Sequence, residues 1–432
     1  MGIGSARLGN LSCGYRQPSS LTEEVLLPSP SPDHVVDWVR RYLGDLACDE
    51  PVSSPRFRGT QAAADEALER FDVRGYAKRR NQVWPVSARG ASGLSPWIRH
   101  GLLSLPRVWD FVGEGPAADV AKFRDELLWA EYSRHLYARL GFGLAGDLRA
   151  SRGPAASPDR QNPWDRSMAC VSLVLRELED NGWIVNQTRM WLASQWSVRH
   201  GARWQEGEDE FFTHLLDGSR AANRAGWQWT VGTGNAKSYG FARWQVEKRA
   251  PGLCASCARR HSCPIQNFPN DRMLAPIEPA AGLRFDNDLQ STSGPSQVQC
   301  TGEAEVVWLT AESLGDDDPA LAANPTLPAV FVFDEPLLSR LGLSGKRLIF
   351  LAERLAELGE ARRVEVYRGK PGEVLDRLKV AATFAPVPGW KRIAAEVEPV
   401  EIHPWSWLRR PGAGSLMSFS AWNGRNARAV KS

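Results

Sequence analysis

The chain has 432 residues and a mass of 47.8 kDa, enough to bury a large hydrophobic core, and two domains are the natural expectation. Its 53 basic and 50 acidic residues give a net charge of +3, so net charge does not indicate a nucleic-acid binder and any basic groove must be local. No apolar run of about 18 residues exists, and the first residues lack an apolar signal core. We therefore expect no membrane span and a cytoplasmic location.

Eighteen tryptophans are several times an ordinary share. They indicate an aromatic helical core on one interpretation and stacking or electron-transfer surfaces on another, and both can hold. Seven cysteines, an odd number, favour free thiols or a metal site over a disulfide framework in a cytoplasmic chain.

The first two thirds of the chain carry helical patterns. Residues 1–54 begin with a stretch rich in Gly, Ser and Pro, and we expect a flexible N-terminus and a linker helix there. A helix with Thr60 as its N-cap follows, and residues 122–140 form a long helix. Residues 186–200 contain neither Gly nor Pro. These patterns predict a mainly α-helical domain over residues 55–300.

The periodicity changes after residue 300. Short apolar stretches at 304–310, 328–334 and 362–369 alternate with helical patterns at 346–360 and 371–379, with a possible fourth strand at 381–387. Strands that alternate with helices predict a parallel sheet. We therefore expect a small, Rossmann-like α/β domain over residues 301–400 and a C-terminal tail over 401–432.

Three motifs in the helical part suggest a family. The sequence reads NQTRM from Asn186, DGSRAANRAGWQW from Asp217, and DELLWAEYSRH from Asp125. These stretches resemble the N-x-x-R-M helix, the DG-x-x-A-x-N-x-x-G-W-Q-W loop and the D-E-L-x-W-x-E-x-x-R-H motif of the DNA photolyase/cryptochrome family. The α/β part resembles the family's antenna domain, which ordinarily comes first, so the resemblance implies a circularly permuted photolyase architecture.

The resemblance implies that FAD is the cofactor. Arg189 and Asp217 would form a buried ion pair beside the flavin ring, and Asn223 would face flavin N5. Gly93 stands where the family usually has Arg, and Ser219 where it often has Asp. The remaining residues that the resemblance places at the cofactor, four of them near its phosphates, are Tyr76, Arg80, Ser92, Ser95 and Trp183.

The resemblance also implies a pocket for a flipped pyrimidine dimer in damaged DNA. Two indoles would stack on the dimer, and a carboxyl and an amide would bind its base edges. The family's (6-4) type has His where this chain has Val185, which favours the cyclobutane type. Gln187 replaces an Arg that contacts DNA phosphate in many relatives. The implied pocket residues are Glu126, Trp129, Asn186, Met190 and Trp229.

The resemblance further implies an electron relay, with Trp227 as its inner and Trp204 as its middle member. No aligned Trp provides the outer member, for which Trp164 and Trp244 are candidates.

Three cysteines, Cys254, Cys257 and Cys263, follow the flavin-binding stretch, with polar residues between them. Their spacing alone slightly favours zinc, held by these thiols with His261 or Cys170. The iron–sulfur bacterial branch of the family places its lone Cys where Cys170 stands, so the resemblance implies a [4Fe–4S] cluster on four thiolates.

The resemblance implies a monomeric enzyme that splits cyclobutane pyrimidine dimers by electron transfer from excited, reduced FAD. A cryptochrome-like blue-light photoreceptor without repair activity is the alternative. A third possibility is a cluster-bearing nucleic-acid-binding domain similar to the large subunit of primase. The sequence leaves open an antenna chromophore, and whether single- or double-stranded DNA is bound.

Overall fold

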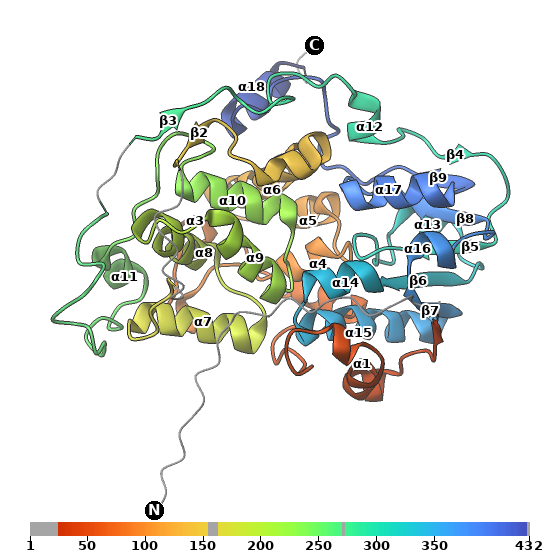
Figure 1. The fold of residues 1–432 in the computed structure, drawn as a ribbon, viewed down its shortest axis with the longest axis horizontal. Helices are drawn as coiled ribbons and strands as arrows, with labels where there is room; N and C mark the ends of the chain where they lie inside the picture. The colour runs from red at the N-terminus through yellow and green to blue at the C-terminus, as the bar shows by residue number, and fades with distance from the viewer. Residues whose placement is uncertain (1–24, 154–162, 270–272, 430–432) are drawn as a thin grey trace, which may run out of the picture.

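The computed structural model describes residues 25–153, 163–269 and 273–429, and it joins a helical unit to an α/β unit (Figure 1). The helical unit contains α2 (Gln61–Glu69), α3 (Tyr76–Arg79), α4 (Ser95–Arg99), α5 (Leu105–Phe111), α6 (Ala117–Leu140), α7 (Ala169–Asn181), α8 (Asn186–Ala193), α9 (Trp204–His214), α10 (Arg220–Val231) and α11 (Arg243–Arg249). A two-stranded sheet of β2 (Ala150–Ser151) and β3 (Ala275–Pro276) lies at its edge.

Local sequence explains where these helices begin and end. Thr60 Oγ1 accepts a hydrogen bond from Ala63 N–H at 3.2 Å, which confirms the predicted N-cap of α2. The long helix α6 contains neither Gly nor Pro and ends at Gly141, whose φ is +54°. Helix α8 continues into a π-helical segment, Ser194–Arg199.

The α/β unit is built on a seven-stranded sheet with the strand order β1-β7-β6-β5-β8-β9-β4. The five inner strands are parallel, and β1 and β4 pair antiparallel at the two edges. The strands are β1 (Val25–Leu27), β4 (Gln299–Cys300), β5 (Val306–Leu309), β6 (Ala329–Asp334), β7 (Val364–Gly369), β8 (Val380–Thr383) and β9 (Glu401–His403). The helices are α1 (Val35–Leu43), α13 (Pro319–Ala323), α14 (Glu335–Leu341), α15 (Gly345–Ala361), α16 (Pro371–Val374) and α17 (Pro388–Val397). Two further helices, α12 (Leu289–Ser293) and α18 (Phe419–Ala429), pack against α6 of the helical unit.

Both faces of the sheet are covered, which is why its strands read as continuous apolar runs. Val307 and Phe331 pack in the core that contains α1 and α15, whereas Trp308 and Val330 pack in the core that contains Trp390 of α17. This alternation follows the two-residue period of a strand.

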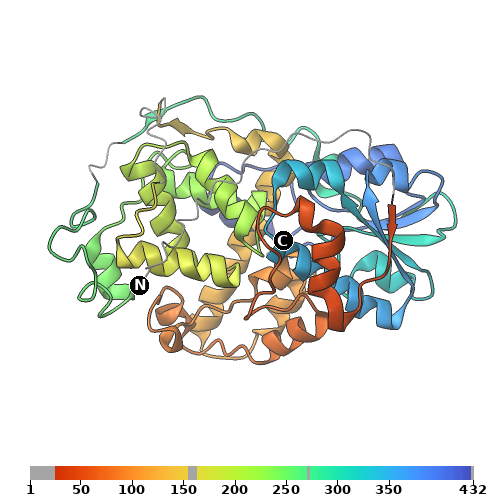
Figure 2. The same ribbon diagram turned by 60° about the horizontal axis from the view of Figure 1, so that its bottom comes forward.

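The N-terminal segment belongs to the α/β unit. We expected residues 1–54 to be a flexible terminus and a linker helix, but β1 pairs with β7 in the register Val25 to Arg368, and α1 packs on α15 (Figure 2). A turn, η2 (Gly44–Leu46), follows α1. No local pattern indicated β1, because its partner strand lies far along the chain. Residues 1–24 lie outside the described part.

The C-terminal segment returns to the helical unit. Residues 401–403 form the parallel strand β9, although we placed them in a tail, and α18 then packs against α6. Tyr132 OH donates to Leu416 O at 2.7 Å, and Trp422 Nε1 donates to His135 Nδ1 at 3.0 Å. The tail is therefore anchored in the helical unit by buried polar contacts.

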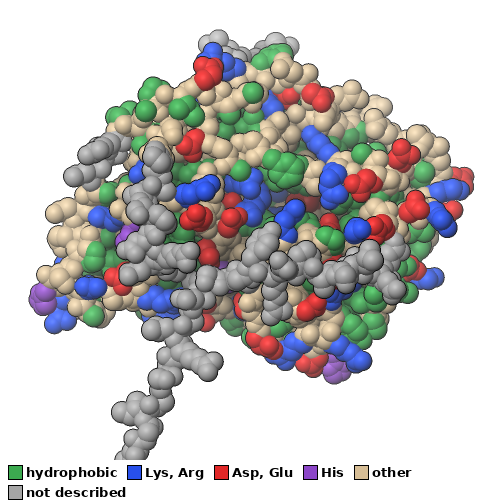
Figure 3. Space-filling view, in the orientation of Figure 1, with side chains coloured by type: hydrophobic (Ala, Val, Ile, Leu, Met, Phe, Trp, Pro, Cys, Tyr) green, Lys and Arg blue, Asp and Glu red, His purple; other side chains and the backbone are tan. Residues whose placement is uncertain are grey.

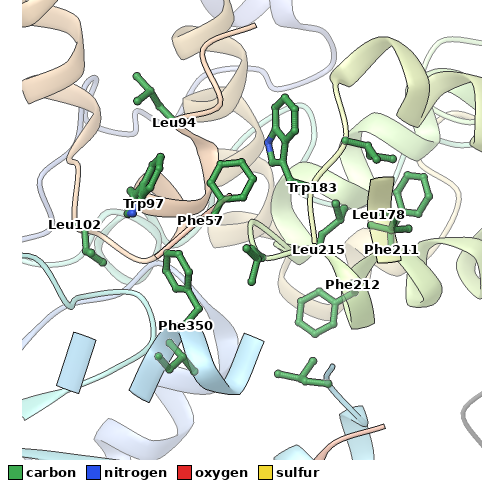
Figure 4. Close-up of a cluster of buried hydrophobic side chains, with 14 of the residues drawn as sticks. Phe57, Leu94, Trp97, Leu102, Leu178, Trp183, Phe211, Phe212, Leu215 and Phe350 are labelled. Carbon is green, nitrogen blue, oxygen red and sulfur yellow. The ribbon is translucent and has the colours of Figure 1, made fainter. Parts of the chain in front are cut away.

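The two units share one hydrophobic core. Phe57, Trp97 and Trp183 of the helical unit lie in the same cluster as Phe350 of α15 (Figure 4). Among the described residues, no helix has both the length and the apolar character that crossing a membrane requires. Basic and acidic side chains are intermixed over the face that Figure 3 shows, as the nearly balanced composition leads one to expect.

Candidate functional site

The centre of the helical unit holds an ion pair between α8 and the loop before α10. Arg189 Nη2 donates to Asp217 Oδ2 at 2.7 Å, and its guanidinium also donates to Ile184 O at 3.1 Å. The Asp217 side chain is 5% exposed. The structure thus brings together two residues that the sequence analysis predicted as partners.

Several buried polar atoms beside this pair have no hydrogen-bond partner within the described part of the chain. They are Asp217 Oδ1, Asn223 Nδ2 and Trp227 Nε1. A buried polar atom without a partner costs about 1–3 kcal/mol, so such atoms are rare and call for an explanation. A flavin carries both donors and acceptors along one ring edge, so these atoms fit a bound FAD.

The backbone around Asp217 is held by the α/β unit. Arg347 of α15 is buried and donates through Nη2 to Gly218 O at 3.1 Å and through Nη1 to Phe212 O. A Cβ on Gly218 would lie 2.9 Å from Arg347 Nη1 and 2.8 Å from Leu215 O, so only glycine fits. The Asp-Gly pair therefore fixes this carboxylate against the sheet.

The serine loop that the resemblance assigns to the cofactor's phosphates lies beside Trp183. Trp183 Nε1 donates to Ser95 Oγ at 2.9 Å, and Leu94 N–H donates to Ser92 Oγ at 3.4 Å. Ser95 is the first residue of α4. Hydroxyl groups therefore gather near Trp183.

An arginine that the sequence analysis missed completes this loop. The Arg56 guanidinium lies 4.6 Å from the centre of the Trp183 ring, and its Nη2 is 3.2 Å from the position of a Cβ on Gly93. Gly93 stands where the resemblance predicts an Arg, and its φ of +73° suits glycine. Arg56 therefore provides a positive charge at this place from another segment, and no local pattern in the sequence pointed to it.

Tyr76 and Arg80 lie on and just after α3, packed against α6. Tyr76 is buried with its ring 4.9 Å from that of Phe123, and burial raises the pKa of its hydroxyl. Arg80 Nε donates to Glu126 Oε1 at 3.2 Å, and Lys122 Nζ lies 3.0 Å from the same oxygen. Arg80, which we predicted to bind the cofactor, therefore forms an ion pair with Glu126, which we predicted to bind the substrate.

The five predicted pocket residues lie on α6, α8 and α10, and α10 packs against both of the others. Asn186 is exposed at the start of α8, Met190 is half-buried, and Trp229 is 42% exposed. Trp129 is stacked on Phe419 of α18, with 3.9 Å between ring centres. One face of Trp129 is therefore covered by the C-terminal segment.

Gln187 and two arginines of α10 make contacts within the protein. Gln187 is buried and donates to Tyr239 OH at 2.9 Å. Arg220 and Arg224 both pair with buried Glu208, at 2.5 and 3.4 Å.

Trp227 begins a chain of aromatic rings. Its ring lies 5.2 Å from Phe211, and a Cβ on Gly207 would lie within 2.3 Å of Trp227 and 2.9 Å of Trp196. Trp164 lies 4.7 Å from Trp196. Trp227 and Trp196 thus both border Gly207, and Trp196 contacts Trp164.

Trp204, which the resemblance makes the middle member of the relay, is buried on α9. Its Nε1 donates to Asp147 Oδ1 at 3.0 Å. Trp244, the other candidate for the outer position, is 48% exposed.

The four predicted metal-binding cysteines line one small pocket together with three arginines. The charged and sulfur-bearing residues of its lining are Cys170, Cys254, Cys257, Cys263, Arg243, Arg259 and Arg260. Burial raises the pKa of Cys170 to about 12, with a further contribution from the neighbouring thiols.

Cys257 Sγ accepts hydrogen bonds from Ala169 N–H and Arg259 N–H, both at 3.4 Å. Such donors stabilise a thiolate bound to metal. His261, which we considered as a zinc ligand, is exposed and accepts from Arg260 Nε at 3.0 Å instead of lining the pocket. The donor set of the pocket is therefore sulfur alone.

Comparisons with known proteins place this site in context. Residues 123–250 match the family model described as the FAD binding domain of DNA photolyase. The chain is 31% identical over 208 residues to the deoxyribodipyrimidine photo-lyase of Vibrio cholerae, covering 43% of each protein. It is 28% identical over 229 residues to cryptochrome DASH of Gloeobacter violaceus, covering 48% of this chain and 45% of that protein.

A crystal structure of a bacterial class III photolyase from Agrobacterium tumefaciens gives a TM-score of 0.40 at 26% identity, covering 46% of this chain and 44% of that one. The chain thus spans less than half the length of the relatives named here. The family model and the two sequence relatives support the photolyase/cryptochrome family and an FAD-binding helical region.

Proposed function

We propose that this chain is a light-dependent flavoprotein that splits cyclobutane pyrimidine dimers in damaged DNA. The observation that carries the proposal is the Arg189–Asp217 ion pair, with Asp217 Oδ1 and Asn223 Nδ2 unsatisfied beside it, inside the region similar to a photolyase FAD-binding domain. FAD, when bound and reduced, would supply the photoexcited electron that breaks the dimer.

The chain's own residues would bind and orient the cofactor. The Arg189 guanidinium balances the Asp217 carboxylate. Asp217 Oδ1 would accept a hydrogen bond from a ring N–H of the flavin, and the Asn223 amide would donate one to the ring edge. Arg56, Ser92 and Ser95 would hold the phosphates, because a guanidinium and hydroxyls are strong partners for these anions.

The substrate would enter beside α6 and α10. The exposed Trp229 indole offers a stacking face, and Trp129 is held in a fixed orientation by Phe419 behind it. Asn186 and Glu126 would bind the base edges, and ion pairs with Arg80 and Lys122 hold the Glu126 carboxylate in place. Met190 would close the pocket floor between these groups.

Electrons that restore the reduced cofactor would pass through tryptophan rings. Trp227 and Trp204 are the members that the family resemblance supplies. The ring sequence Trp227, Trp196 and Trp164 offers a second branch that leads toward α7, which carries Cys170.

The cysteine pocket would hold a [4Fe–4S] cluster rather than zinc. All four thiols lie in the described part of the chain, and no three of their sulfurs come within 4.8 Å of one another. A zinc tetrahedron with Zn–S bonds of about 2.3 Å needs sulfurs about 3.8 Å apart, whereas a cluster of several irons needs a wider frame. The three arginines would offset its negative charge.

The order of the units supports a circular permutation as part of this proposal. The region similar to the FAD-binding domain is followed by the parallel sheet, whose strands β5 to β9 all come later in the chain. In the family that the chain resembles, the α/β antenna domain ordinarily precedes the FAD-binding domain.

The test begins with anaerobic purification. We expect flavin absorption, about four irons per chain as a cubane requires, and light-dependent loss of dimers from an ultraviolet-damaged oligonucleotide with reduced enzyme. Flavin without any dimer loss in light would refute repair. Protein that never binds added FAD would refute the whole proposal.

A blue-light receptor without repair is the second candidate, and buried Gln187 favours it because the amide cannot reach a DNA backbone. Affinity for dimer-containing DNA in the dark separates the two functions: a repair enzyme prefers damaged over undamaged DNA, and a receptor does not.

A further inference from the structure

A second group of metal-ligating side chains lies away from the flavin-type site, where the N-terminal segment meets α9. Cys48 and Asp49 follow η2, and His214 is the last residue of α9. The sulfur, a carboxylate oxygen and an imidazole nitrogen of these residues lie within 4.8 Å of one another. The photochemistry proposed above uses none of them.

Backbone hydrogen bonds hold this group in place without an ion. Cys48 N–H donates to Leu343 O at 3.0 Å. Asp49 Oδ1 accepts from Gly345 N–H at 2.7 Å, at the start of α15. One carboxylate oxygen is therefore fixed by the backbone, which leaves Oδ2 directed to the imidazole. A fixed ligand orientation of this kind strengthens metal binding.

The distance between the ligand atoms of His214 and Asp49 is close to the distance between two ligands of one metal ion. His214 Nδ1 and Asp49 Oδ2 are 4.0 Å apart, too far for a hydrogen bond. Zn–N and Zn–O bonds are about 2.0–2.2 Å, so the edge of a tetrahedral site is about 3.4 Å. The Asp49 side chain is 44% exposed, which allows it to make up this small difference.

The charges also match a divalent cation. The His214 imidazole is 11% exposed and presents Nδ1 toward Asp49 Oδ2, so it offers a ring nitrogen as a ligand. A thiolate and the Asp49 carboxylate would together balance two positive charges. The charged groups near the His214 ring are two acidic side chains, Asp49 and Glu179, and two basic ones, Lys346 and Arg347.

We propose that Cys48, Asp49 and His214 bind one Zn²⁺ ion, with water in the fourth position. Mixed nitrogen, sulfur and oxygen donors are the set that zinc accepts. The ion would fasten the N-terminal segment to the C-terminal end of α9, where Ser344 N–H already donates to Thr213 O at 3.1 Å. Its role would be to strengthen the junction between the two units.

The experiment uses the full chain with its iron and zinc contents measured after purification. We titrate it anaerobically with Co²⁺ and then with Zn²⁺, and follow sulfur-to-cobalt charge-transfer absorption, bound equivalents and Tm. The parent protein should bind one metal equivalent more than Cys48→Ser or His214→Gln. Zinc should raise the parent's Tm by roughly 2–5 °C and leave these two variants unchanged.

Matched controls separate this site from the cysteine pocket. Cys300→Ser removes an exposed thiol elsewhere and should retain the extra equivalent. Asp49→Asn keeps the Oδ1 acceptor for Gly345 and should fold, yet bind zinc at least tenfold more weakly. Equal equivalents and equal Tm shifts in the parent and in all three ligand variants would overturn the proposal.

Discussion

The helical unit and the α/β unit satisfy their buried polar groups differently. In the α/β unit, buried Asp318 accepts from Thr383 Oγ1 at 2.8 Å and from Leu321 N–H at 3.1 Å. In the helical unit, Asp217 and Asn223 each keep an unsatisfied buried atom. The α/β unit also has such atoms, on Ser344, Arg347, Trp390 and Trp405 among the described residues, and Arg347 lies against the loop that carries Asp217.

The unsatisfied atoms of Asp217 and Asn223 are those that the proposed flavin would satisfy, whereas Asp318 finds its partners within the protein. Each unsatisfied buried group costs about 1–3 kcal/mol, so several in one place are tolerated when a bound molecule satisfies them. The predictions below test this contrast.

The largest effect is expected from Asp217→Asn, which keeps the shape and removes the charge opposite Arg189. We expect flavin content to fall at least tenfold and the free energy of unfolding to fall by about 3 kcal/mol, since a buried charge loses its partner. Flavin absorbance per protein and urea unfolding measure both quantities. Asp209→Asn, at a carboxylate 63% exposed, is the control and should change neither. Normal flavin content in Asp217→Asn would contradict the proposal that the unsatisfied Asp217 oxygen binds the flavin.

Cys257→Ser should empty the metal pocket, because its sulfur is the one that two backbone N–H groups already support. We expect iron and acid-labile sulfide to fall severalfold while Cys300→Ser keeps both. Elemental analysis with absorption spectra decides this, and unchanged iron in Cys257→Ser would exclude that thiol as a ligand.

Trp229→Ala should weaken binding of a dimer-containing oligonucleotide in the dark by roughly 5- to 100-fold, because stacking on one aromatic ring contributes about 1–3 kcal/mol. Trp244→Ala removes a similarly exposed indole on α11 and should bind like the parent. Equal losses in both variants would mean that exposed tryptophans bind DNA without a specific pocket.

The smallest effect concerns pH. Burial lowers the pKa of His100 and of His135 to about 3. Between that value and about 6.5 the unfolded chain binds more protons, so stability falls as pH decreases from 6.5 toward 3. From pH 7 to 5.5 we expect each histidine to remove about 1 kcal/mol from the free energy of unfolding. Urea unfolding at the two pH values measures it, and a slope that His135→Gln leaves unchanged would contradict this account.

Motifs with local spacing were predictable from the sequence. The Arg189–Asp217 pair and the four cysteines are present together in the structure although each set joins two segments, because the resemblance to a known family supplied the partners that local spacing could not. The strands β5, β6, β7 and β8 followed from their apolar runs.

Contacts between distant segments were not predictable. Arg56 reaches the serine loop from the linker before α2, and Phe419 reaches Trp129 from the other end of the chain. Nothing in the periodicity near either residue encodes a partner so far away, because such contacts arise only when the two units pack.

The edge strand β1 has a consequence for synthesis on the ribosome. Val25 pairs with Arg368, so β1 has no partner strand until more than three quarters of the chain has been synthesised after it. At about 5–20 residues per second, that interval is roughly 20–70 s. During it the nascent chain carries an unpaired strand whose Val25 and Leu26 remain exposed even in the folded protein, which makes this segment a natural site for a chaperone to protect.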